Sequence, residues 1–196
     1  TYFIECIRRM AGWRNCQAQT YCKEAVTRYE IVRKSDEGDY NIVYSARRVR
    51  SMQNSLVAIK MWKKACASHE IDIMRYLGGC NENCVMPMVD ACASASLIAI
   101  VMPLCDRSLQ QIFEEQLICT NTVHFSIARG VAKGLAHMHC KKILHLNLDA
   151  RKIMLTDLDS DLKVCVSNFD MVASTTEPFG EPSFSQLHQR WYRAPE

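Results

Sequence analysis

Three side chains in the second half of the sequence determine which chemistry it could perform: Asn147, Lys152 and Asn168. An amide oxygen is not basic at neutral pH, so Asn147 does not take a proton from a hydroxyl group as a carboxylate would. Asn168 offers a metal ion only an uncharged carbonyl oxygen, whereas Mg²⁺ prefers hard, anionic oxygen ligands. The ammonium group of Lys152 opposes a cation in the same place. None of the three side chains supplies a strong general base or an anionic magnesium ligand.

A second candidate pair lies in the first half of the sequence. Lys60 follows the apolar residues Val57-Ala58-Ile59, and Glu70 comes ten residues later. A long ammonium side chain neutralises phosphate charge efficiently only if another group holds it in place, and a carboxylate can do so. Taken alone, a lysine on an apolar strand is more often a residue that extends its charged end to the sheet edge.

The composition excludes several classes of protein. Of 196 residues, 48% are hydrophobic and 23% are charged, which is typical of a globular protein. The net charge is only +3 and the basic pairs are scattered, so we expect no nucleic-acid surface. The longest apolar run, Leu97–Met102, fits one buried strand and is too short to span a membrane. We therefore expect no membrane partner.

Cysteine is frequent, with 11 residues, but the count is odd and no C-x-x-C motif occurs. Cys80, Cys84 and Cys92 form the tightest cluster, and zinc would require closer pairing and a clear fourth ligand. Free thiols in a reducing compartment are the favoured interpretation, which predicts a cytoplasmic, intracellular protein.

The hydrophobic pattern predicts an α+β arrangement of two lobes joined near Pro103. Residues 1–28 are expected to form a helical extension or the tail of an upstream domain. The next block is expected to contain five strands and one helix, at Tyr29–Arg33, Ile42–Val49, Leu56–Trp62, Ala65–Leu77 (the helix), Val85–Val89 and Leu97–Met102. The last block is expected to contain helices at Ser108–Glu115 and Val123–Cys140, then a hairpin of strands Ile153–Leu155 and Leu162–Val166.

Several motifs, in this order along the chain, resemble the eukaryotic protein kinase domain. Val57–Lys60 matches the V-A-I-K strand, and His145–Lys152 follows the frame of the catalytic loop H-R-D-L-x-x-x-N. Asn168-Phe169-Asp170 is placed at D-F-G, because this register keeps the aromatic residue; Val166-Ser167-Asn168 is the alternative. Trp191–Glu196 matches the closing A-P-E segment, and its W-Y-R-A-P-E form is most similar to the cyclin-dependent and mitogen-activated kinases.

The resemblance implies a bilobal fold over residues 29–196. Residues 29–103 would form an N-lobe with a five-stranded sheet and one helix. Residues 104–196 would form a truncated, mainly helical C-lobe that ends at the activation segment. ATP is the ligand that the family implies, and magnesium is expected to bind weakly or not at all. The positions that the resemblance assigns to nucleotide binding are Gly38, Val43, Ala58, Lys60, Glu70, Met102, Leu104, Cys105 and Met154.

The residues that depart from the family pattern are those expected to take part in catalysis and metal binding, whereas the residues that define the motifs' positions are retained. Asn147, Lys152 and Asn168 replace the catalytic aspartate, the second metal ligand and the D-F-G aspartate. Asp149 stands where Ser/Thr kinases carry lysine, and we expect it to pair with Lys152 or Arg151; a relocated base is the alternative.

Two further positions depart from the pattern. Leu146 replaces the arginine that, in the family, binds a phosphate on the activation segment. Ser183 and Ser185 lie near the positions where that phosphorylation would be expected. In the glycine-rich loop only Gly38 remains, and the neighbouring acids weaken phosphate binding.

These departures favour a pseudokinase, a kinase-shaped domain whose catalysis is absent or strongly impaired. It would bind nucleotide weakly or without metal and act in signalling as a scaffold or allosteric regulator. Its partner would be a protein, such as an active kinase or a substrate. The alternatives are an atypical active Ser/Thr-type protein kinase and an interaction module that binds no nucleotide.

Overall fold

The protein is described by a computed structural model that covers residues 28–37, 41–49, 56–62, 68–93, 98–117, 120–158 and 161–175. These residues form two compact units. The first comprises the described residues up to Asp72 together with Met88–Leu104, and the second comprises Ile73–Pro87 and the described residues from Cys105 onward. The helical segment expected at residues 1–28 lies outside the described part of the chain except for Arg28, and Gly38, Ser183, Ser185 and Trp191–Glu196 also lie outside it.

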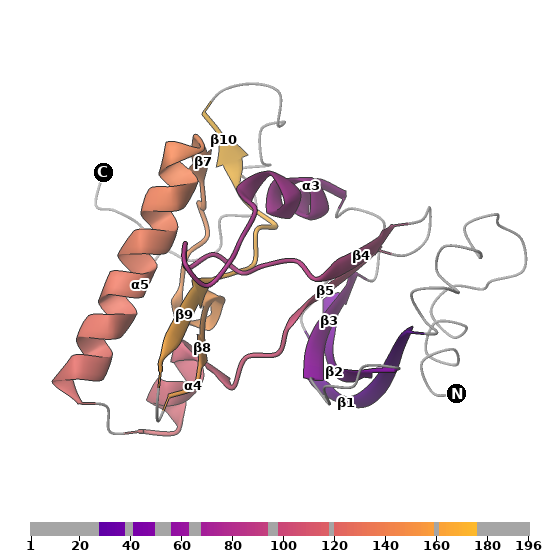
Figure 1. Ribbon diagram of the computed structural model, residues 1–196, viewed down its shortest axis with the longest axis horizontal. Coiled ribbons are helices and arrows are strands. Elements are labelled where there is room, and N and C mark those ends of the chain that lie inside the picture. Colours follow the sequence, from indigo (N-terminus) through magenta and orange to yellow (C-terminus); the bar gives the residue numbers. More distant parts are fainter. Residues whose placement is uncertain are drawn as a thin grey trace, which may run out of the picture. The chain divides into compact units, whose positions relative to one another are not determined.

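The first unit is built on a five-stranded sheet with the order β1-β2-β3-β5-β4 (Figure 1). All neighbouring strands are antiparallel. The strands are β1 (Tyr29–Glu37), β2 (Asn41–Arg48), β3 (Leu56–Trp62), β4 (Asp90–Ala93) and β5 (Ile98–Pro103).

The two faces of this sheet have different roles, because side chains alternate along each strand. One face carries a buried apolar cluster that runs across the strands: Tyr29, Tyr44, Ala46, Val57, Ile59, Met61, Ala99 and Val101. The other face carries Lys60, whose register partners are Val43 on β2 and Ile100 on β5. Ala58 lies two residues before Lys60 and pairs with Met102, so it points to the same side. The candidate nucleotide residues that lie on these strands, Val43, Ala58, Lys60 and Met102, therefore share one face, and the apolar core occupies the other.

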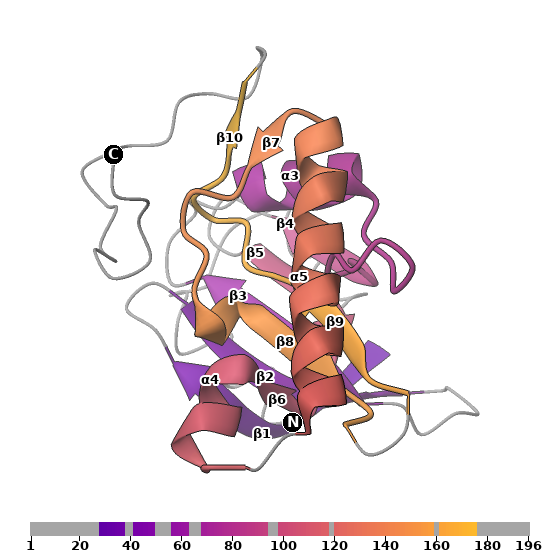
Figure 2. The ribbon, with the colours of Figure 1, turned by 90° about the vertical axis from the view of Figure 1, so that its left-hand side faces the viewer.

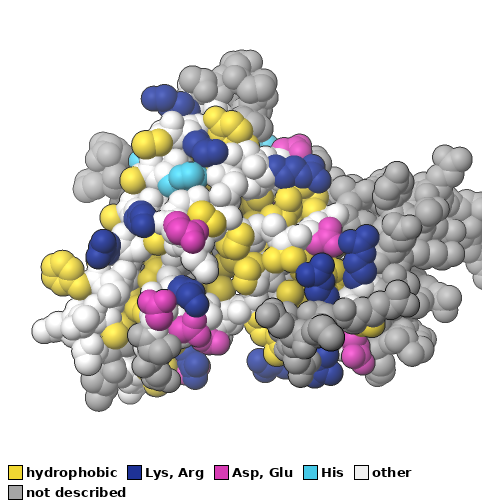
Figure 3. All heavy atoms as spheres, in the orientation of Figure 1, with side chains coloured by type: hydrophobic (Ala, Val, Ile, Leu, Met, Phe, Trp, Pro, Cys, Tyr) yellow, Lys and Arg dark blue, Asp and Glu magenta, His cyan; other side chains and the backbone are white. Residues whose placement is uncertain are grey.

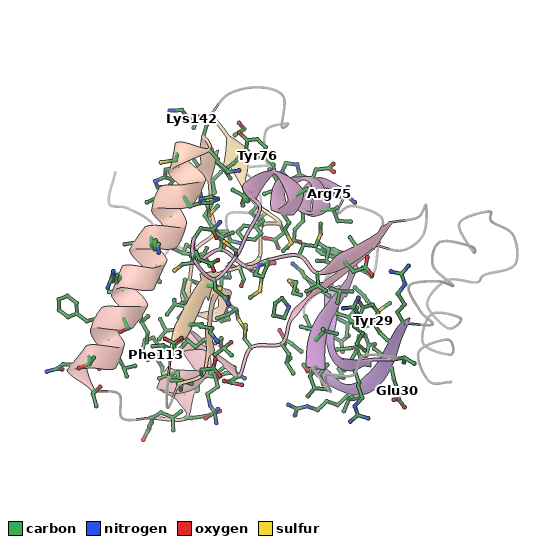
Figure 4. All side chains as sticks on the ribbon, viewed as in Figure 1. Tyr29, Glu30, Arg75, Tyr76, Phe113 and Lys142 are labelled. Carbon is green, nitrogen blue, oxygen red and sulfur yellow. The ribbon has the colours of Figure 1, made fainter. Side chains whose placement is uncertain are left out.

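Helix α3 (Ser68–Leu77) follows β3 in sequence, and its last turn belongs to the second unit. Two side chains at the C-terminal end of helix α5 (Asn121–Cys140) donate to the final carbonyls of α3: Lys141 Nζ to Tyr76 O at 2.7 Å, and His137 Nε2 to Leu77 O at 2.8 Å. Figure 4 shows Tyr76 at this end of the helix. These bonds satisfy carbonyls that a helix terminus leaves unpaired. The C-terminal end of α3 is thus fixed by side chains rather than by solvent.

The second unit also contains two further α-helices, one short 3₁₀ helix and two small sheets. The helices are α4 (Leu109–Glu114), α5 (Asn121–Cys140) and the short 3₁₀ helix η1 (Ala150–Lys152). One sheet has the order β6-β8-β9, with β6 (Arg107–Ser108), β8 (Ile153–Thr156) and β9 (Lys163–Val166); the other pairs β7 (Ile143–Leu144) with β10 (Ala173–Ser174).

Helix α5 packs closely against β9, and Figures 1 and 2 both show the two side by side. A β-carbon built on Gly134 would lie 2.6 Å from Cys84 O and 2.8 Å from Val166 Cγ2. The same stretch bonds the backbone of β9 to the segment after α3, since Val166 N–H donates to Cys84 O at 2.9 Å and Met86 N–H donates to Val166 O at 2.9 Å. Because Gly134 has no side chain, α5 can lie close to Val166 on β9 and to the carbonyl of Cys84.

Most of the predicted elements are found within a few residues of their expected bounds, including four of the five expected strands, the single helix among them and the β8–β9 hairpin. One prediction is wrong: Val85–Val89 does not form a strand of the sheet. Val85 makes only an isolated bridge to Val166, and the strand that pairs with β5 begins at Asp90. The apolar residues at 85 and 86 are buried because they lie beside β9, which accounts for the strand-like pattern.

No helix among the described residues is long and apolar enough to cross a membrane. On the face shown in Figure 3, lysine and arginine side chains are dispersed among acidic ones. The described residues contain no group of three or more His, Cys, Asp or Glu side chains that could hold a metal ion. The five cysteines whose side chains are described are free thiols, namely Cys80, Cys84, Cys105, Cys140 and Cys165, while the side chain of Cys92 is not described.

We predict that Gly134→Ala destabilises the protein by about 1–3 kcal/mol, because the added methyl group overlaps the Cys84 carbonyl. The usual effect of this substitution inside a helix is the opposite, a gain of about 1 kcal/mol. Urea denaturation measures the difference. Thr122→Ala, at an exposed position of the same helix, serves as the control and should change stability by less than about 0.5 kcal/mol. A stabilised Gly134→Ala variant would contradict the close approach.

Candidate functional site

The first cluster of candidate residues is the ion pair between Lys60 and Glu70. Lys60 Nζ lies 3.0 Å from Glu70 Oε1 and 2.9 Å from Oε2, so the carboxylate binds the ammonium with both oxygens. Their side chains are only 7% and 2% exposed. Breaking a buried pair typically costs about 3–5 kcal/mol, because one charge is left uncompensated. The structure therefore brings together the two residues that the sequence placed ten positions apart.

Trp62 completes this first cluster, and sequence reasoning missed its role. Lys60 Nζ lies 4.5 Å from the centroid of the Trp62 ring, which is a cation–π distance. The signal was present in the sequence: two residues along a strand place both side chains on the same face. Strand periodicity alone, however, does not indicate that the ring reaches the ammonium.

Three other candidate nucleotide residues of the first unit occupy the same face of the sheet as Lys60. Val43 and Ala58 lie on β2 and β3, and Met102 lies on β5 opposite Ala58. Ala58 is buried, while Val43 and Met102 are half-buried. Leu104 follows the last residue of β5 and is also half-buried. The face thus combines one ammonium group with an apolar surface of the kind that a flat ring requires.

The two acidic residues just before Gly38, Asp36 and Glu37, are exposed, and part of their charge is neutralised. Asp36 accepts the backbone N–H of Glu37 at 2.8 Å, and Glu37 pairs with Lys34. This pairing reduces, without removing, the negative charge expected there.

The second cluster lies in the loop His145–Lys152 and is organised by Asp149. Its side chain is 2% exposed and caps η1 by accepting the backbone N–H of Arg151 at 2.8 Å. The same carboxylate accepts from Lys152 Nζ at 3.0 Å and from Arg151 Nη2 at 3.1 Å. The sequence left open whether Asp149 pairs with Lys152 or Arg151, and the structure shows both contacts.

The two cations around Asp149 differ in burial. The Lys152 side chain is 9% exposed, whereas that of Arg151 is 61% exposed. The buried neutralisation of Asp149 therefore comes from Lys152, because an ion pair open to water contributes little. A carboxylate held in this way is shielded from solvent and has few lone pairs available for a further partner.

Two residues at or beside the amide positions have left-handed backbone conformations. Leu146 and Asn168 have positive φ values of 57° and 66°. Asparagine tolerates this region, while a branched apolar residue is strained in it. Asn147 N–H donates to His145 O at 2.8 Å, which closes a tight turn around Leu146. The backbone bonds of the loop, rather than the preference of Leu146, hold this shape.

His145 and Phe169 connect this loop to the segment around Asn168. His145 Nε2 donates to Ser167 O at 3.1 Å, and the two rings lie with centroids 5.9 Å apart. Phe169 is fully buried. His145 Nδ1 is buried and has no hydrogen-bond partner among the described residues. Burial lowers the pKa of His145, and the charge of Lys152 acts in the same direction.

The remaining candidates, Met154 and Cys105, lie in the second unit. Met154 is half-buried on β8, where it pairs with Cys165 on β9. Burial raises the pKa of the Cys105 thiol, and it raises that of Cys165 to about 12. Both cysteines are therefore neutral thiols at physiological pH.

The family is decided by a comparison with protein-family models. The model of the protein kinase domain matches residues 29–196. The chain belongs to the protein kinase domain family. The α+β fold expected from the motifs, with a five-stranded N-lobe sheet and one helix, is confirmed.

Curated relatives of this kinase domain carry the names of the predicted branch. Serine/threonine-protein kinase crk1 of Schizosaccharomyces pombe is 29% identical over 185 residues, which cover 90% of this chain and 50% of that protein. Mitogen-activated protein kinase 2 of Arabidopsis thaliana is 28% identical over 185 residues, 88% of this chain and 47% of that protein. Cyclin-dependent kinase 7 of Caenorhabditis elegans is 25% identical over 184 residues, 86% of this chain and 52% of that protein. This kinase domain thus spans about half the length of the curated relatives it matches.

We predict that Lys152→Met destabilises the kinase domain by about 3–5 kcal/mol, because it leaves the Asp149 carboxylate buried without its buried cation. Arg151→Ala, which removes the exposed cation from the same carboxylate, is the matched control and should cost less than about 1 kcal/mol. Urea denaturation of both variants tests the assignment. Equal losses would contradict the unequal roles of the two cations.

The lowered pKa of His145 predicts a stability that falls with acid. The ordinary histidine value is 6.5, so the unfolded chain takes up a proton at a higher pH than the folded chain does. The contribution of His145 is fully present above pH 6.5 and is lost as the pH falls through the lower folded value. The slope from this single group is at most about 1.4 kcal/mol per pH unit.

Urea denaturation between pH 7.5 and pH 5, for the native chain and for His145→Gln, isolates this effect because the other histidines are common to both. We expect the native chain to lose more stability than His145→Gln as the pH is lowered. Parallel curves would show that His145 is not held neutral by burial.

Proposed function

We propose that this kinase domain is a pseudokinase that regulates or anchors a protein partner in signalling. One observation carries the proposal. Asp149 is the only carboxylate between His145 and Lys152, and it is buried against the ammonium of Lys152. The two positions at which the family places acids hold the amides Asn147 and Asn168. Neither a general base nor an anionic metal ligand is then supplied by the loop.

The magnitude of these losses supports impaired catalysis. General acid–base assistance commonly contributes about 10²–10⁴-fold to a rate. Phosphoryl transfer in addition depends on metal ions that neutralise the charge on the transferring group. Kinases in general use ATP with Mg²⁺. The side chains at this site do not fit magnesium, because Asn147 and Asn168 offer only neutral oxygens and Asp149 is paired with Lys152. At most Asn168 contributes a weak ligand.

Nucleotide binding without metal is part of the proposal. The Lys60–Glu70 pair and the apolar face that carries Val43, Ala58 and Met102 fit the requirements of phosphate and purine. Lys152 adds positive charge where family members hold a metal ion. Binding is expected to be weak, since the glycine-rich loop position is acidic and retains one glycine.

Two alternatives have their own support. An atypical active Ser/Thr-type kinase is favoured by the formed Lys60–Glu70 pair and by relatives that carry Ser/Thr kinase names. A module that binds no nucleotide is favoured by the acids around Gly38. For the proposed role, the partner is a protein such as an active kinase or a substrate, and free thiols fit an intracellular setting.

We predict that ATP raises the melting temperature of the full chain slightly and to the same extent with Mg²⁺ as with EDTA. A thermal-shift titration measures this, with Lys60→Met as the control that loses the shift. Stabilisation that requires Mg²⁺ would favour the active kinase, and no stabilisation at any ATP concentration would favour the module that binds no nucleotide.

Catalysis is tested separately by transfer of labelled phosphate to Ser/Thr peptides and to the chain itself. We expect the native chain to match Lys60→Met, with no signal above background. Magnesium-dependent transfer that Lys60→Met abolishes would overturn the pseudokinase proposal.

A further inference from the structure

Helix α3 needs tertiary anchors, because it has only 10 residues. Helices shorter than about 12–15 residues are marginal in isolation. Its apolar residues Ile71, Ile73, Met74 and Leu77 are buried. Its last turn is held by His137 and Lys141. Its first turn is held to the sheet through Glu70 and Lys60, so the state of this ion pair decides whether the first turn stays in place.

The ammonium of Lys60 is unusually well satisfied before any ligand arrives. Both oxygens of Glu70 accept from it, and the ring of Trp62 lies 4.5 Å from the nitrogen. Trp62 is itself buried, at 6% exposure. The negative face of an indole attracts a cation most strongly when water is excluded, and it brings no charge that would need a partner of its own. The three side chains form a neutral, buried cluster.

We propose that Trp62 is a positioning residue: it holds Lys60 on Glu70, so that α3 stays docked on β3 without nucleotide or partner. In this domain the helix is a fixed element, and its exposed residues Asp72, Arg75 and Tyr76 form a surface that does not depend on ligand. The inference concerns the helix alone and holds whether or not the domain transfers phosphate.

Amide hydrogen exchange of residues 70–77 in the full chain measures the opening of α3. In the native chain we expect the same slow exchange with and without ATP. Trp62→Leu should increase the opening equilibrium constant about five- to thirtyfold, the factor that corresponds to a desolvated cation–π contact. Trp62→Phe, which keeps an aromatic face, should recover most of this loss.

A double-mutant cycle separates the charge contact from simple packing. Trp62→Leu also removes volume, but this loss is the same whether residue 60 is lysine or methionine. We therefore expect Trp62→Leu to open α3 at least about fivefold more in the native background than in Lys60→Met. An equal effect in both backgrounds would show that Trp62 acts only by filling space and would overturn the proposal. So would native exchange at α3 that ATP slows severalfold.

Fluorinated tryptophan tests the same contact without changing the shape of the side chain, which matters if the substituted variants fold poorly. Biosynthetic replacement of the three tryptophans by fluorinated tryptophan weakens the negative ring face with little change in volume. Opening of α3 should rise with the degree of fluorination in the native chain and stay constant in Lys60→Met. A flat response in the native chain would overturn the role of the ring.

Discussion

Charge that is buried must be neutralised within the chain, and this constraint organises both units of the structure. Among the described residues the buried charged side chains are Lys60, Glu70, Asp149 and Lys152, and they form two ion pairs, one in each unit. Each pair ties a functional segment to its surroundings: the first joins α3 to the sheet, and the second closes the loop His145–Lys152. The stability of the two segments and their chemistry therefore depend on the same side chains.

Under the proposed function, the two pairs have opposite consequences for phosphoryl chemistry. In the first pair the cation lies in the V-A-I-K motif, and the buried carboxylate would hold it in place for an anionic ligand. In the second pair Asp149, the only carboxylate of the loop His145–Lys152, is buried against Lys152. The interaction that orders this loop thus also keeps its carboxylate away from solvent.

The sequence predicted the elements better than it predicted the contacts. The apolar residues along Leu56–Trp62 identified β3 with its observed bounds, and the resemblance to the kinase motif anticipated the ion pair of Lys60 and Glu70. The strand expected at Val85–Val89 does not form, because its buried residues, Val85 and Met86, lie beside β9, a neighbour far along the chain that local periodicity does not reveal. The ring of Trp62 over Lys60 was missed for a similar reason, since a strand pattern gives the side on which a residue lies but not its distance to a cation. For Asp149 the sequence supplied both candidate partners, and only packing determined which of them is buried.

The positive φ values at Leu146 and Asn168 have a broader consequence. Leucine is a poor occupant of this backbone region, yet the loop retains its turn, because His145, Asp149 and Lys152 supply the bonds that define it. Asparagine and aspartate both tolerate the conformation at position 168. The shape of the loop therefore depends on these bonds rather than on the backbone preference of Leu146, and a domain built in this way keeps its architecture with an unfavourable residue in its turn.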